Sequence, residues 1–547
     1  MRTIIGRQRS LIQNRRGLSN IIIVALSFVI LVVIVSNVIL RSYQMNQLDW
    51  ERSREKIEIT NVVFLRPNSM QIAFENQGSL TAHLVSLWID NSTLHYRQDI
   101  NLYVDSGETS IYFATFGWKQ KTTYVVNLVT EKGNKATFSA ANTPNAGAML
   151  AYGEGSVAFP RYRLWNGVSW NGESSGGLTS ATIQWILLKS SPLRNEKILA
   201  VLSSTGYLDV SVWDGSKQTW SSPVRMASVG TTIDAYRLFD IAYEQSSGKG
   251  IIVYNPSATG VDPQYNIWNG SAWSSPKTVG IATTGVIYWI KLASKPLSDE
   301  VALVTLNANN DVYGMIWNGT TWSNGLPLET TAAISTEEDI AVEYMQVSRK
   351  AMFVWGAGTS VESRIWEVNA WGNELAAVSI GATPNWFSLK ADPNSDRLVL
   401  VSVDGASDLN SVRWNGTNWT LDSEHDDSVE TNAARCADAE FETTPGHEGH
   451  IILVWGDFNT NPVTYKHFDG TSWGGATQVP TSAIPTTRQQ WHVLRRSDDD
   501  KILLSTLDNG LDINTAYWDG ANWFWSDEVE TSASTTGMQS FDVAPDV

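Results

Sequence analysis

Cysteine is nearly absent from this sequence, which has a single one, Cys436, among 547 residues. One cysteine excludes an intrachain disulfide and any zinc site built from several thiolates. Basic residues are also scarce, with 39 Lys and Arg against 56 Asp and Glu, and the net charge is −17. This balance argues against nucleic acid as a partner, because phosphates are bound through basic side chains. Tryptophan, in contrast, occurs 25 times and requires a periodic explanation.

Charge is missing altogether from the 24 residues between Arg16 and Arg41. A helix of this length spans about 36 Å, enough to cross the hydrocarbon core of a membrane. The residues before it include no acid but five arginines: Arg2, Arg7, Arg9, Arg15 and Arg16. This flank predicts a single span with a cytoplasmic N-terminus and an extracellular remainder. A secretory signal fits less well, because the run is long and no small-x-small cleavage site follows it.

The stretch Arg15-Arg16-Gly17-Leu18-Ser19 stands directly at the start of this apolar run. It resembles the class III signal peptide of archaeal type IV pilins and archaellins. The resemblance implies that a prepilin peptidase removes residues 1–17 by cutting between Gly17 and Leu18. Residues 18–56 would then form the helix that anchors the subunit and packs with other pilin subunits in a filament. Many pilins carry a glutamate five residues after the cut, where this chain has Ile22, and a plain signal anchor is the alternative.

Residues 57–142 alternate short apolar segments with turn signals. Met70-Gln71-Ile72-Ala73-Phe74 and Thr123-Tyr124-Val125-Val126-Asn127-Leu128 are two of the segments that predict strands. Asn76-Gln77-Gly78 and Lys132-Gly133-Asn134 are two of the turns between them. About seven short strands in this length predict a small Ig-like β-sandwich.

Residues 146–547 contain an internal repeat. Eight stretches share one frame: LWNGVSW, VWDGSKQTW, IWNGSAW, IWNGTTW, IWEVNAW, RWNGTNW, HFDGTSW and YWDGANW. Their first aromatic residues are 48 to 55 positions apart, at Trp165, Trp213, Trp268, Trp317, Trp366, Trp414, Phe468 and Trp518. Asn-Gly or Asp-Gly between two β segments predicts a type I′ hairpin. Eight strand-rich units of about fifty residues predict an eight-bladed β-propeller, so the fold class is mainly β.

A second period of about a hundred residues groups the predicted blades in pairs. Four blades open with a tryptophan: Trp185, Trp289, Trp386 and Trp491. Three others open with an Asp-type segment that starts at Asp240, Asp339 or Asp438. The fourth Asp-type segment lies at the end of the chain, at Asp542-Val543-Ala544-Pro545-Asp546. The C-terminal strand is therefore expected to complete the first blade and close the ring, which leaves no exposed edge.

Carboxylates four residues apart on the Asp-type strands are expected to face the same side, the central channel. The eight carboxylates are Asp240, Glu244, Asp339, Glu343, Asp438, Glu442, Asp542 and Asp546. Ca²⁺ would suit such a set, and the four tryptophans together with carboxylates could hold a glycan. The alternative is that the tryptophans fill the space between blades and the aspartates bond to turn backbone. The sequence leaves both the ligand and any metal open.

Enzyme motifs are absent from the repeat. No HExxH sequence occurs, and His447-Glu448-Gly449-His450 appears once, in a predicted hairpin loop. The protein is therefore expected not to be an enzyme, and fold alone does not supply a function. Five asparagines open acceptor sequons in predicted turns: Asn91, Asn269, Asn318, Asn415 and Asn418.

Three hypotheses follow from the sequence. The first is a filament or tip subunit whose propeller is an adhesive head, and the second is an anchored surface protein that binds a ligand without polymerising. The third is a surface glycosidase.

Overall fold

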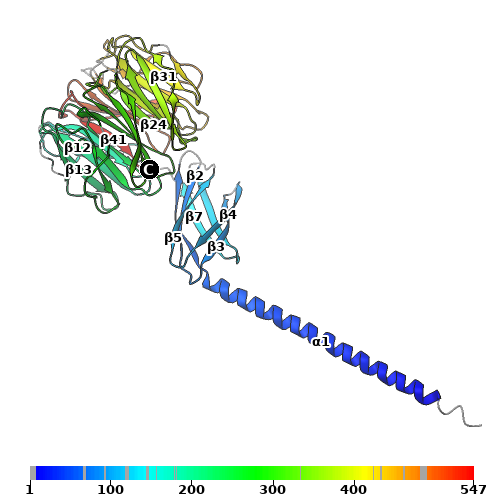
Figure 1. The fold of residues 1–547 in the computed structure, drawn as a ribbon. Coiled ribbons are helices and arrows are strands. Elements are labelled where there is room, and N and C mark those ends of the chain that lie inside the picture. Colours follow the sequence, from blue (N-terminus) through cyan, green and yellow to red (C-terminus); the bar gives the residue numbers. More distant parts are fainter. Residues whose placement is uncertain are drawn as a thin grey trace, which may run out of the picture. The chain divides into compact units, whose positions relative to one another are not determined.

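The computed structural model describes residues 8–546 except 66–68, 92–93, 117–121, 143–146, 156, 178, 180, 282, 333, 423, 431–433, 460–461 and 481–488. Part of the predicted leader, residues 1–7, lies outside the described residues, as do Ser92 and Thr93 of the first sequon. The chain divides into two compact units, residues 1–143 and 144–547, each described here by itself (Figure 1).

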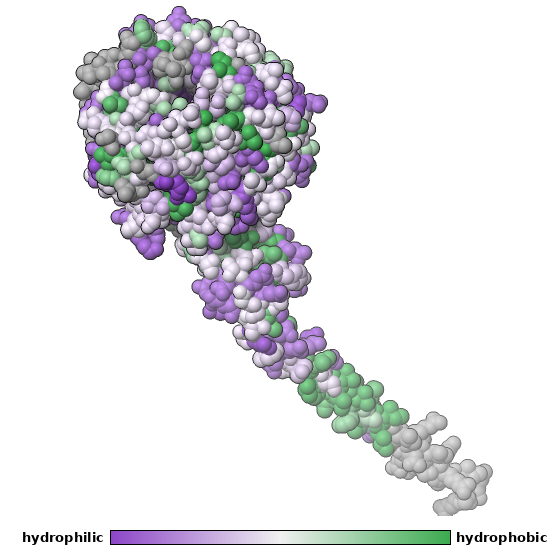
Figure 2. Space-filling view, turned by 60° about the vertical axis from the view of Figure 1, so that its left-hand side comes forward, coloured by the Kyte–Doolittle hydropathy of each residue, from purple (hydrophilic) through white to green (hydrophobic). Residues whose placement is uncertain are grey.

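The first unit begins with one long helix, α1 (Gln8–Arg54). The sequence predicted a helix over 18–56, so α1 begins ten residues earlier, within the leader, and ends two residues earlier. Residues 18–54 contain no Gly or Pro that would interrupt the hydrogen bonding. From Ile21 to Leu40 the large apolar side chains are exposed, and Figure 2 shows them as a hydrophobic band along the helix. Within the described residues, this helix alone is long and apolar enough to cross a membrane.

A seven-stranded β-sandwich follows the helix. One sheet has the order β1 (Ile57–Leu65), β2 (Ser69–Asn76), β5 (Thr109–Thr115). The other has the order β4 (His95–Val104), β3 (Ala82–Asp90), β6 (Thr122–Thr130), β7 (Lys135–Asn142). Inward side chains of both sheets, such as Phe74, Leu87 and Val126, form one core from which water is excluded.

Polar contacts join the end of α1 to the sandwich. The Asn134 Nδ2 donates to the Arg52 carbonyl at 2.8 Å, where a helix end leaves carbonyls without helical partners. The buried Glu55 carboxylate accepts from Thr130 Oγ1 at 2.6 Å. These hydrogen bonds attach the end of α1 to the sandwich.

The second unit contains eight antiparallel sheets among its described residues. They are numbered sheets 1 to 8 along the chain, and the strands of each sheet are given from the innermost strand outward. Sheet 1 is β41 (Phe541–Pro545), β8 (Ala148–Tyr152), β9 (Arg161–Trp165), β10 (Ser174–Ser175); sheet 2 is β11 (Ile183–Ser190), β12 (Glu196–Ser203), β13 (Tyr207–Asp214), with β14 (Thr219–Trp220) and β15 (Val224–Ser228) on β13. Sheet 3 is β16 (Phe239–Tyr243), β17 (Gly250–Tyr254), β18 (Gln264–Trp268), β19 (Lys277–Thr278); sheet 4 is β20 (Ile287–Ser294), β21 (Glu300–Asn307), β22 (Val312–Asn318), β23 (Trp322–Glu329).

The other four sheets repeat this plan. Sheet 5 is β24 (Ile340–Tyr344), β25 (Ala351–Ala357), β26 (Ser360–Glu367), with β27 (Ala370–Glu374) and β28 (Val378–Ser379) on β26; sheet 6 is β29 (Pro384–Ala391), β30 (Leu398–Asp404), β31 (Leu409–Trp414), β32 (Trp419–Leu421). Sheet 7 is β33 (Ala437–Phe441), β34 (Ile451–Gly456), β35 (Val463–Phe468), β36 (Thr477–Gln478); sheet 8 is β37 (Gln489–Arg496), β38 (Ile502–Asp508), β39 (Ile513–Trp518), β40 (Trp523–Glu530).

The innermost strands of the sheets contact one another in order, which is the arrangement of a β-propeller. The contacts run β41, β11, β16, β20, β24, β29, β33, β37 and back to β41. The last strand of the chain, β41, pairs with β8 from Phe541↔Tyr152 to Pro545↔Ala148. This pairing confirms the expectation that the C-terminal strand completes the first sheet, so β8 presents no open edge.

In sheet 5, Glu367 pairs with Ala370, and Val368 and Asn369 between them both have positive φ, as a type I′ turn requires. The Asn-Gly turn of sheet 1 differs from this prediction. Trp165 pairs with Trp170, so four residues, not two, lie between the paired positions. Of these, Gly167 has a positive φ of 94°, whereas a type I′ turn needs two residues with positive φ. The Asn166 Oδ1 accepts from the backbone N–H of Val168 and Ser169, both at 2.9 Å. The Asn side chain thus accepts hydrogen bonds from two backbone N–H groups of the turn, which explains why Asn or Asp precedes the Gly.

Candidate functional site

The four tryptophans that open sheets 2, 4, 6 and 8 are buried. Trp185, Trp289, Trp386 and Trp491 are 3 to 6% exposed. Trp185 meets Trp289 and Trp491 edge to face, with ring centroids 6.2 and 5.9 Å apart. The Nε1 of Trp185 donates to the Asp234 carbonyl at 3.2 Å. Their faces are covered by other side chains, so the expectation that they hold a sugar in the channel is corrected to a packing role.

Three predicted aspartates connect neighbouring sheets. Asp240, Asp438 and Asp542 are at most 4% exposed and occupy the second position of β16, β33 and β41. Each accepts the backbone N–H of a leucine on the next innermost strand: Leu292 at 2.9 Å, Leu494 at 2.8 Å and Leu188 at 3.0 Å. These carboxylates satisfy buried backbone donors, as the alternative expected, but the donors belong to strands of the next sheet and not to turns.

The alignment of Asp339 with the other three aspartates is wrong by two residues. Asp240 pairs with Val253 and Asp438 with Val454, and the equivalent residue of β24 is Ala341, which pairs with Val354. A shift of two residues keeps the strand face but places Asp339 before the start of β24. Asp339 is buried and is not among the side chains that line the central cavity, and burial raises its pKa well above the ordinary value.

The remaining four carboxylates do not converge either. Glu244 accepts the Trp317 Nε1 at 2.6 Å, Glu442 contacts histidines of its own sheet, and Asp546 pairs with Lys197. Glu343 faces the channel, at the place that Glu440 holds in sheet 7. The eight predicted carboxylates therefore do not form one site, because several lie beyond the end of their strand.

A cavity of about 250 Å³ lies at the centre of the propeller, among the innermost strands. The acidic side chains that line it are Asp240, Glu343 and Asp438. Its basic side chains, which the sequence reasoning missed, are Lys189, Arg237, Lys291, Lys390, Arg435 and Arg495. A signal for four of them was present: a base follows each opening tryptophan by two or four residues, and thus shares its strand face, whereas Arg237 and Arg435 have no such signal.

Most of these cations are held in ion pairs. Glu338 is the hub of one group: it contacts Arg237, Arg435 and the Lys291 Nζ, the last at 2.7 Å. Burial would raise the pKa of Glu338, but the attraction of these three cations outweighs it and holds that pKa below its ordinary value.

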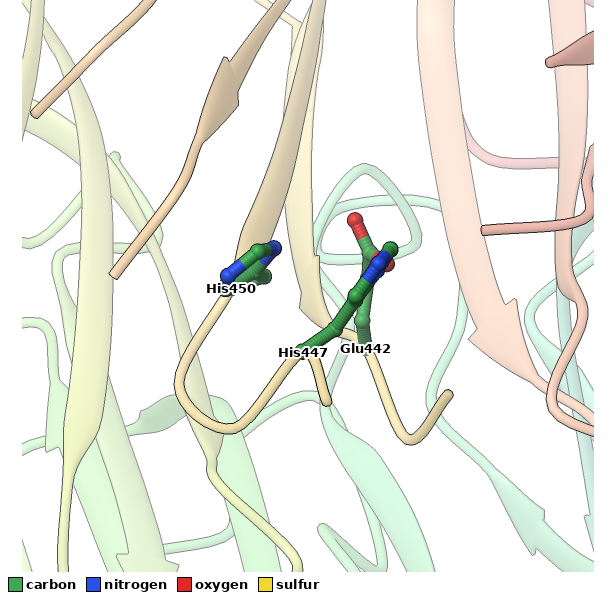
Figure 3. Close-up of side chains that lie close together, drawn as sticks. All are labelled: Glu442, His447 and His450. Carbon is green, nitrogen blue, oxygen red and sulfur yellow. The ribbon is translucent and has the colours of Figure 1, made fainter. Parts of the chain in front are cut away.

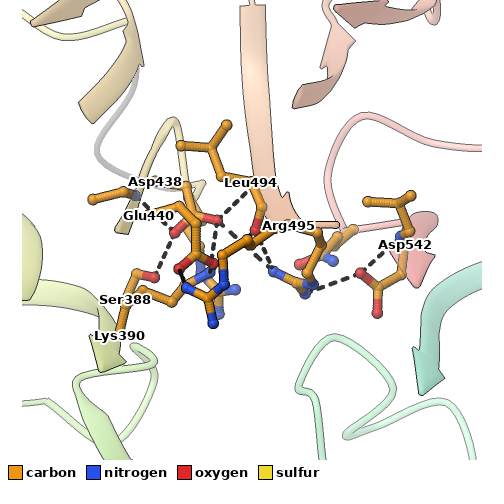
Figure 4. Close-up of polar contacts among 12 residues, drawn as sticks. Ser388, Lys390, Asp438, Glu440, Leu494, Arg495 and Asp542 are labelled. Atoms are coloured by element: carbon orange, nitrogen blue, oxygen red, sulfur yellow. Dashed lines mark hydrogen bonds and ion pairs between the residues drawn. The ribbon is translucent and has the colours of Figure 1, made fainter. Parts of the chain in front are cut away.

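Figure 4 shows the second group, on the side of sheets 6 to 8. Arg495 connects Asp542, at 3.0 Å, with Asp438, at 3.9 Å, and Lys390 contacts Asp438 at 3.5 Å. Lys189 has no ion-pair partner within the described part of the chain. A lining with twice as many bases as acids does not suit Ca²⁺, which prefers several free carboxylates and carbonyls.

A second, larger pocket of about 510 Å³ opens at the outer part of sheets 2 and 3. The half-buried Trp268 and Trp273 line it, with ring centroids 5.5 Å apart. Arg225 also lines it, packed over the Tyr207 ring and paired with the Asp209 carboxylate at 2.8 Å. Asn266 and several serine hydroxyls complete the wall. This pocket combines accessible aromatic surface with hydrogen-bonding groups, as ligand sites commonly do.

The predicted glycosylation sites lie in turns. Asn269, Asn318, Asn415 and Asn418 are exposed, whereas Asn91 is half-buried and its Oδ1 accepts from the Leu94 N–H at 2.7 Å. In the turn of sheet 3, the Ser271 hydroxyl of the sequon donates to the Asn269 Oδ1 at 2.9 Å. Modification of these residues stays a prediction.

No family model and no curated protein matches this chain. Among solved structures, a six-bladed fungal lectin from Aleuria aurantia with fucose recognition is 13% identical, with a TM-score of 0.33 over 54% of this chain and 96% of the lectin. The lectin SapL1 in complex with alpha methyl fucoside is 14% identical, with a TM-score of 0.32 over 55% of this chain and 98% of that one. The dihydro-heme d1 dehydrogenase NirN is 11% identical, with a TM-score of 0.44 over 70% and 73%. Similarities this low assign no ligand or activity to the chain.

Proposed function

We propose that this protein is a type IV pilin-like subunit of the cell surface, with an Ig-like sandwich and an eight-bladed propeller as its binding head. The observation that carries the proposal is helix α1, which is continuous over 47 residues. It starts in a basic leader, continues through an exposed apolar segment and ends on the sandwich through Asn134. The exposed apolar segment of such a helix can span a membrane and, once the basic leader is removed, can pack against other helices in a filament core.

The alternative is an anchored surface protein that never polymerises. It would use the same helix and the same head, so the two hypotheses differ in what happens at Gly17. In a pilin-like subunit the leader is removed and the mature chain begins at Leu18, which leaves an apolar end that other helices can cover. In a plain anchor the leader arginines stay, and burying them in a filament would be costly.

For the head, we propose binding of a glycan without catalysis, in the pocket at sheets 2 and 3. The pocket supports this proposal because Trp268 and Trp273 offer apolar faces for sugar C–H groups, while its serine hydroxyls can form hydrogen bonds. The central cavity supports it less well, because its tryptophans are covered and most of its charges are already paired.

Binding to a glycan panel tests the proposal for the head. The full chain in detergent should bind at least one glycan class, and Trp273→Ala should weaken that binding by about tenfold or more, equivalent to about 1.4 kcal/mol. Trp170→Ala is the matched control, because Trp170 is the equivalent residue of sheet 1 and lies outside this pocket. Equal binding by the two variants would contradict the pocket assignment, and release of hydrolysis products would favour the surface glycosidase.

A further inference from the structure

Three metal-ligating side chains meet in sheet 7, away from both pockets: ligand atoms of Glu442, His447 and His450 lie within 4.8 Å of one another. A fourth such side chain, His467, lies beside Glu442. Glu442 follows β33, His447 and His450 lie in the loop before β34, and His467 lies on β35. Figure 3 shows Glu442, His447 and His450 grouped beside this loop. The His447 Nδ1 is 2.6 Å from Glu442 Oε2, and the His467 Nε2 is 2.8 Å from Glu442 Oε1. The rings of His447 and His450 are stacked with centroids 4.5 Å apart, and those of His450 and His467 are 5.1 Å apart.

The polar atoms of this cluster are buried but incompletely satisfied. The Glu442 side chain is 1% exposed. Among the described residues, its Oε1, the His467 Nε2 and the His450 Nδ1 are buried and have no hydrogen-bond partner. The 2.8 Å approach of Oε1 to Nε2 lacks the geometry of a hydrogen bond. A buried carboxylate whose second oxygen has no donor needs another partner, since leaving it unpaired costs free energy.

The repeat supplies an internal comparison, because the position of Glu442 recurs in sheets 3 and 5. The backbone N–H of Glu244, Met345 and Glu442 each donates to the last residue of the loop that follows, at 2.8, 2.9 and 3.0 Å. Glu244 is satisfied by the Trp317 Nε1 of the next sheet, and sheet 5 has no carboxylate there at all. The repeat therefore does not need histidines at this place.

Sheet 7 departs from the other two sheets in the loop that carries His447 and His450 and at the position of His467. Its loop between the first two strands has nine residues, 442–450, against six in sheets 3 and 5. Gly446 and Gly449 have φ of 90° and 83° on either side of the segment that carries His447, which lets the longer loop fold back over Glu442. His467 replaces an aliphatic residue, since its equivalents are Ile267 and Ile365.

We propose that Glu442, His447, His450 and His467 bind one transition-metal ion with the preferences of Zn²⁺. Three imidazoles and one carboxylate are a donor set that zinc accepts, with four ligands at about 2.0–2.2 Å in a tetrahedron. Ca²⁺ is excluded by the same set, because it takes six to eight oxygen ligands. All four ligands come from one sheet, so the ion would fix the long loop to β35. The site is closed by four protein ligands, which indicates a structural rather than a hydrolytic metal.

Metal titration of the full chain, purified in detergent without a histidine tag, tests this site. We expect one Zn²⁺ per chain by calorimetry, and one Co²⁺ with the intense visible absorption of tetrahedral coordination. His450→Ala and Glu442→Gln should lose this stoichiometric binding and the absorption. Glu448→Gln is the matched control, because Glu448 belongs to the same loop but not to the cluster, and it should bind as the wild type does.

Several outcomes would overturn the proposal. They are the absence of Zn²⁺ and Co²⁺ binding to the wild type, a Co²⁺ spectrum without tetrahedral bands, and displacement of Zn²⁺ by millimolar Ca²⁺. The wild-type titration decides even where a variant fails to fold. Because the readout is metal binding, its result is independent of the glycan and of the position of the mature N-terminus.

Discussion

Glu343 and Glu440 occupy equivalent strand positions but have different surroundings, and of the two only Glu343 lines the central cavity. Glu440 on β33 pairs with Arg496 at 2.9 Å and with Lys390 at 3.5 Å. Glu343 on β24 accepts the backbone N–H of Tyr344 at 2.9 Å, and no ion pair to it exists within the described residues. Burial raises the pKa of Glu343 from its ordinary 4.5 to about 7, although the charges of Lys189 and Lys390 oppose this. The nearby Glu440 adds to the increase.

The raised pKa makes stability depend on pH. Between pH 4.5 and 7 the folded chain holds a proton on Glu343 that the unfolded chain has lost, so stability falls as the pH rises through this window. Glu343→Gln should remove this fall and make the protein more stable than the wild type at pH 8, by on the order of 2 kcal/mol, but not at pH 5. Thermal unfolding at both pH values measures it, with the surface variant Glu367→Gln as control. Parallel pH profiles for wild type and Glu343→Gln would contradict the assignment.

At the scale of elements, regular patterns could be read from the sequence and local shifts could not. The apolar run predicted helix α1, and the segment at Asp542 predicted strand β41 and its pairing. Asp339 was misaligned by two residues, and because strand periodicity is two, such a slip keeps the alternating pattern and cannot be detected from it. The turn at Asn166 was misassigned because Asn-Gly suits several loop lengths.

Side-chain clusters were harder to predict than strands. The histidines of sheet 7 lie at sequence separations of up to 20 residues, and only the fold brings His467 against Glu442. Four basic side chains of the cavity come from the alternate sheets 2, 4, 6 and 8, whereas Arg237 and Arg435 precede the first strands of sheets 3 and 7. Neither the pairing of cavity bases with Glu338 nor the burial of Glu338 is visible in a local motif. In both cases the sequence contains the metal-ligating or charged residues, but it does not show which strands bring them together.

The pairing of β41 with β8 predicts the effect of a truncation. Deleting residues 541–547 removes the innermost strand of sheet 1 together with Asp542, which accepts from Leu188 and pairs with Arg495. The edge of β8 is then unpaired, so we expect loss of cooperative melting and aggregation. Scanning calorimetry with light scattering measures both. Removal of Val547 alone is the control, and a truncated chain that melts like the full one would contradict the closure of the ring.

The whole molecule combines one exposed apolar helix with two β-rich parts that are built without disulfides, since Cys436 is the single cysteine. The sandwich and the propeller each have their own core. Each could therefore keep its fold while the helix exchanges the lipid environment for other helices. The protein is thereby suited to display a head from a membrane or from a filament, and the fate of its leader decides between them.

The mature N-terminus of the native protein tests this account most directly. Mass spectrometry of the chain from host membranes and from sheared surface filaments should identify Leu18 as the first residue in both fractions. Gly17→Val should block the cut while insertion continues, because the apolar run is unchanged, and this variant should stay in the membrane fraction. Gly6→Val, which also alters a leader glycine, should be processed as the wild type is. A native chain that begins at Met1 or Arg2, and is absent from sheared filaments, would contradict the pilin-like account and leave the plain anchor.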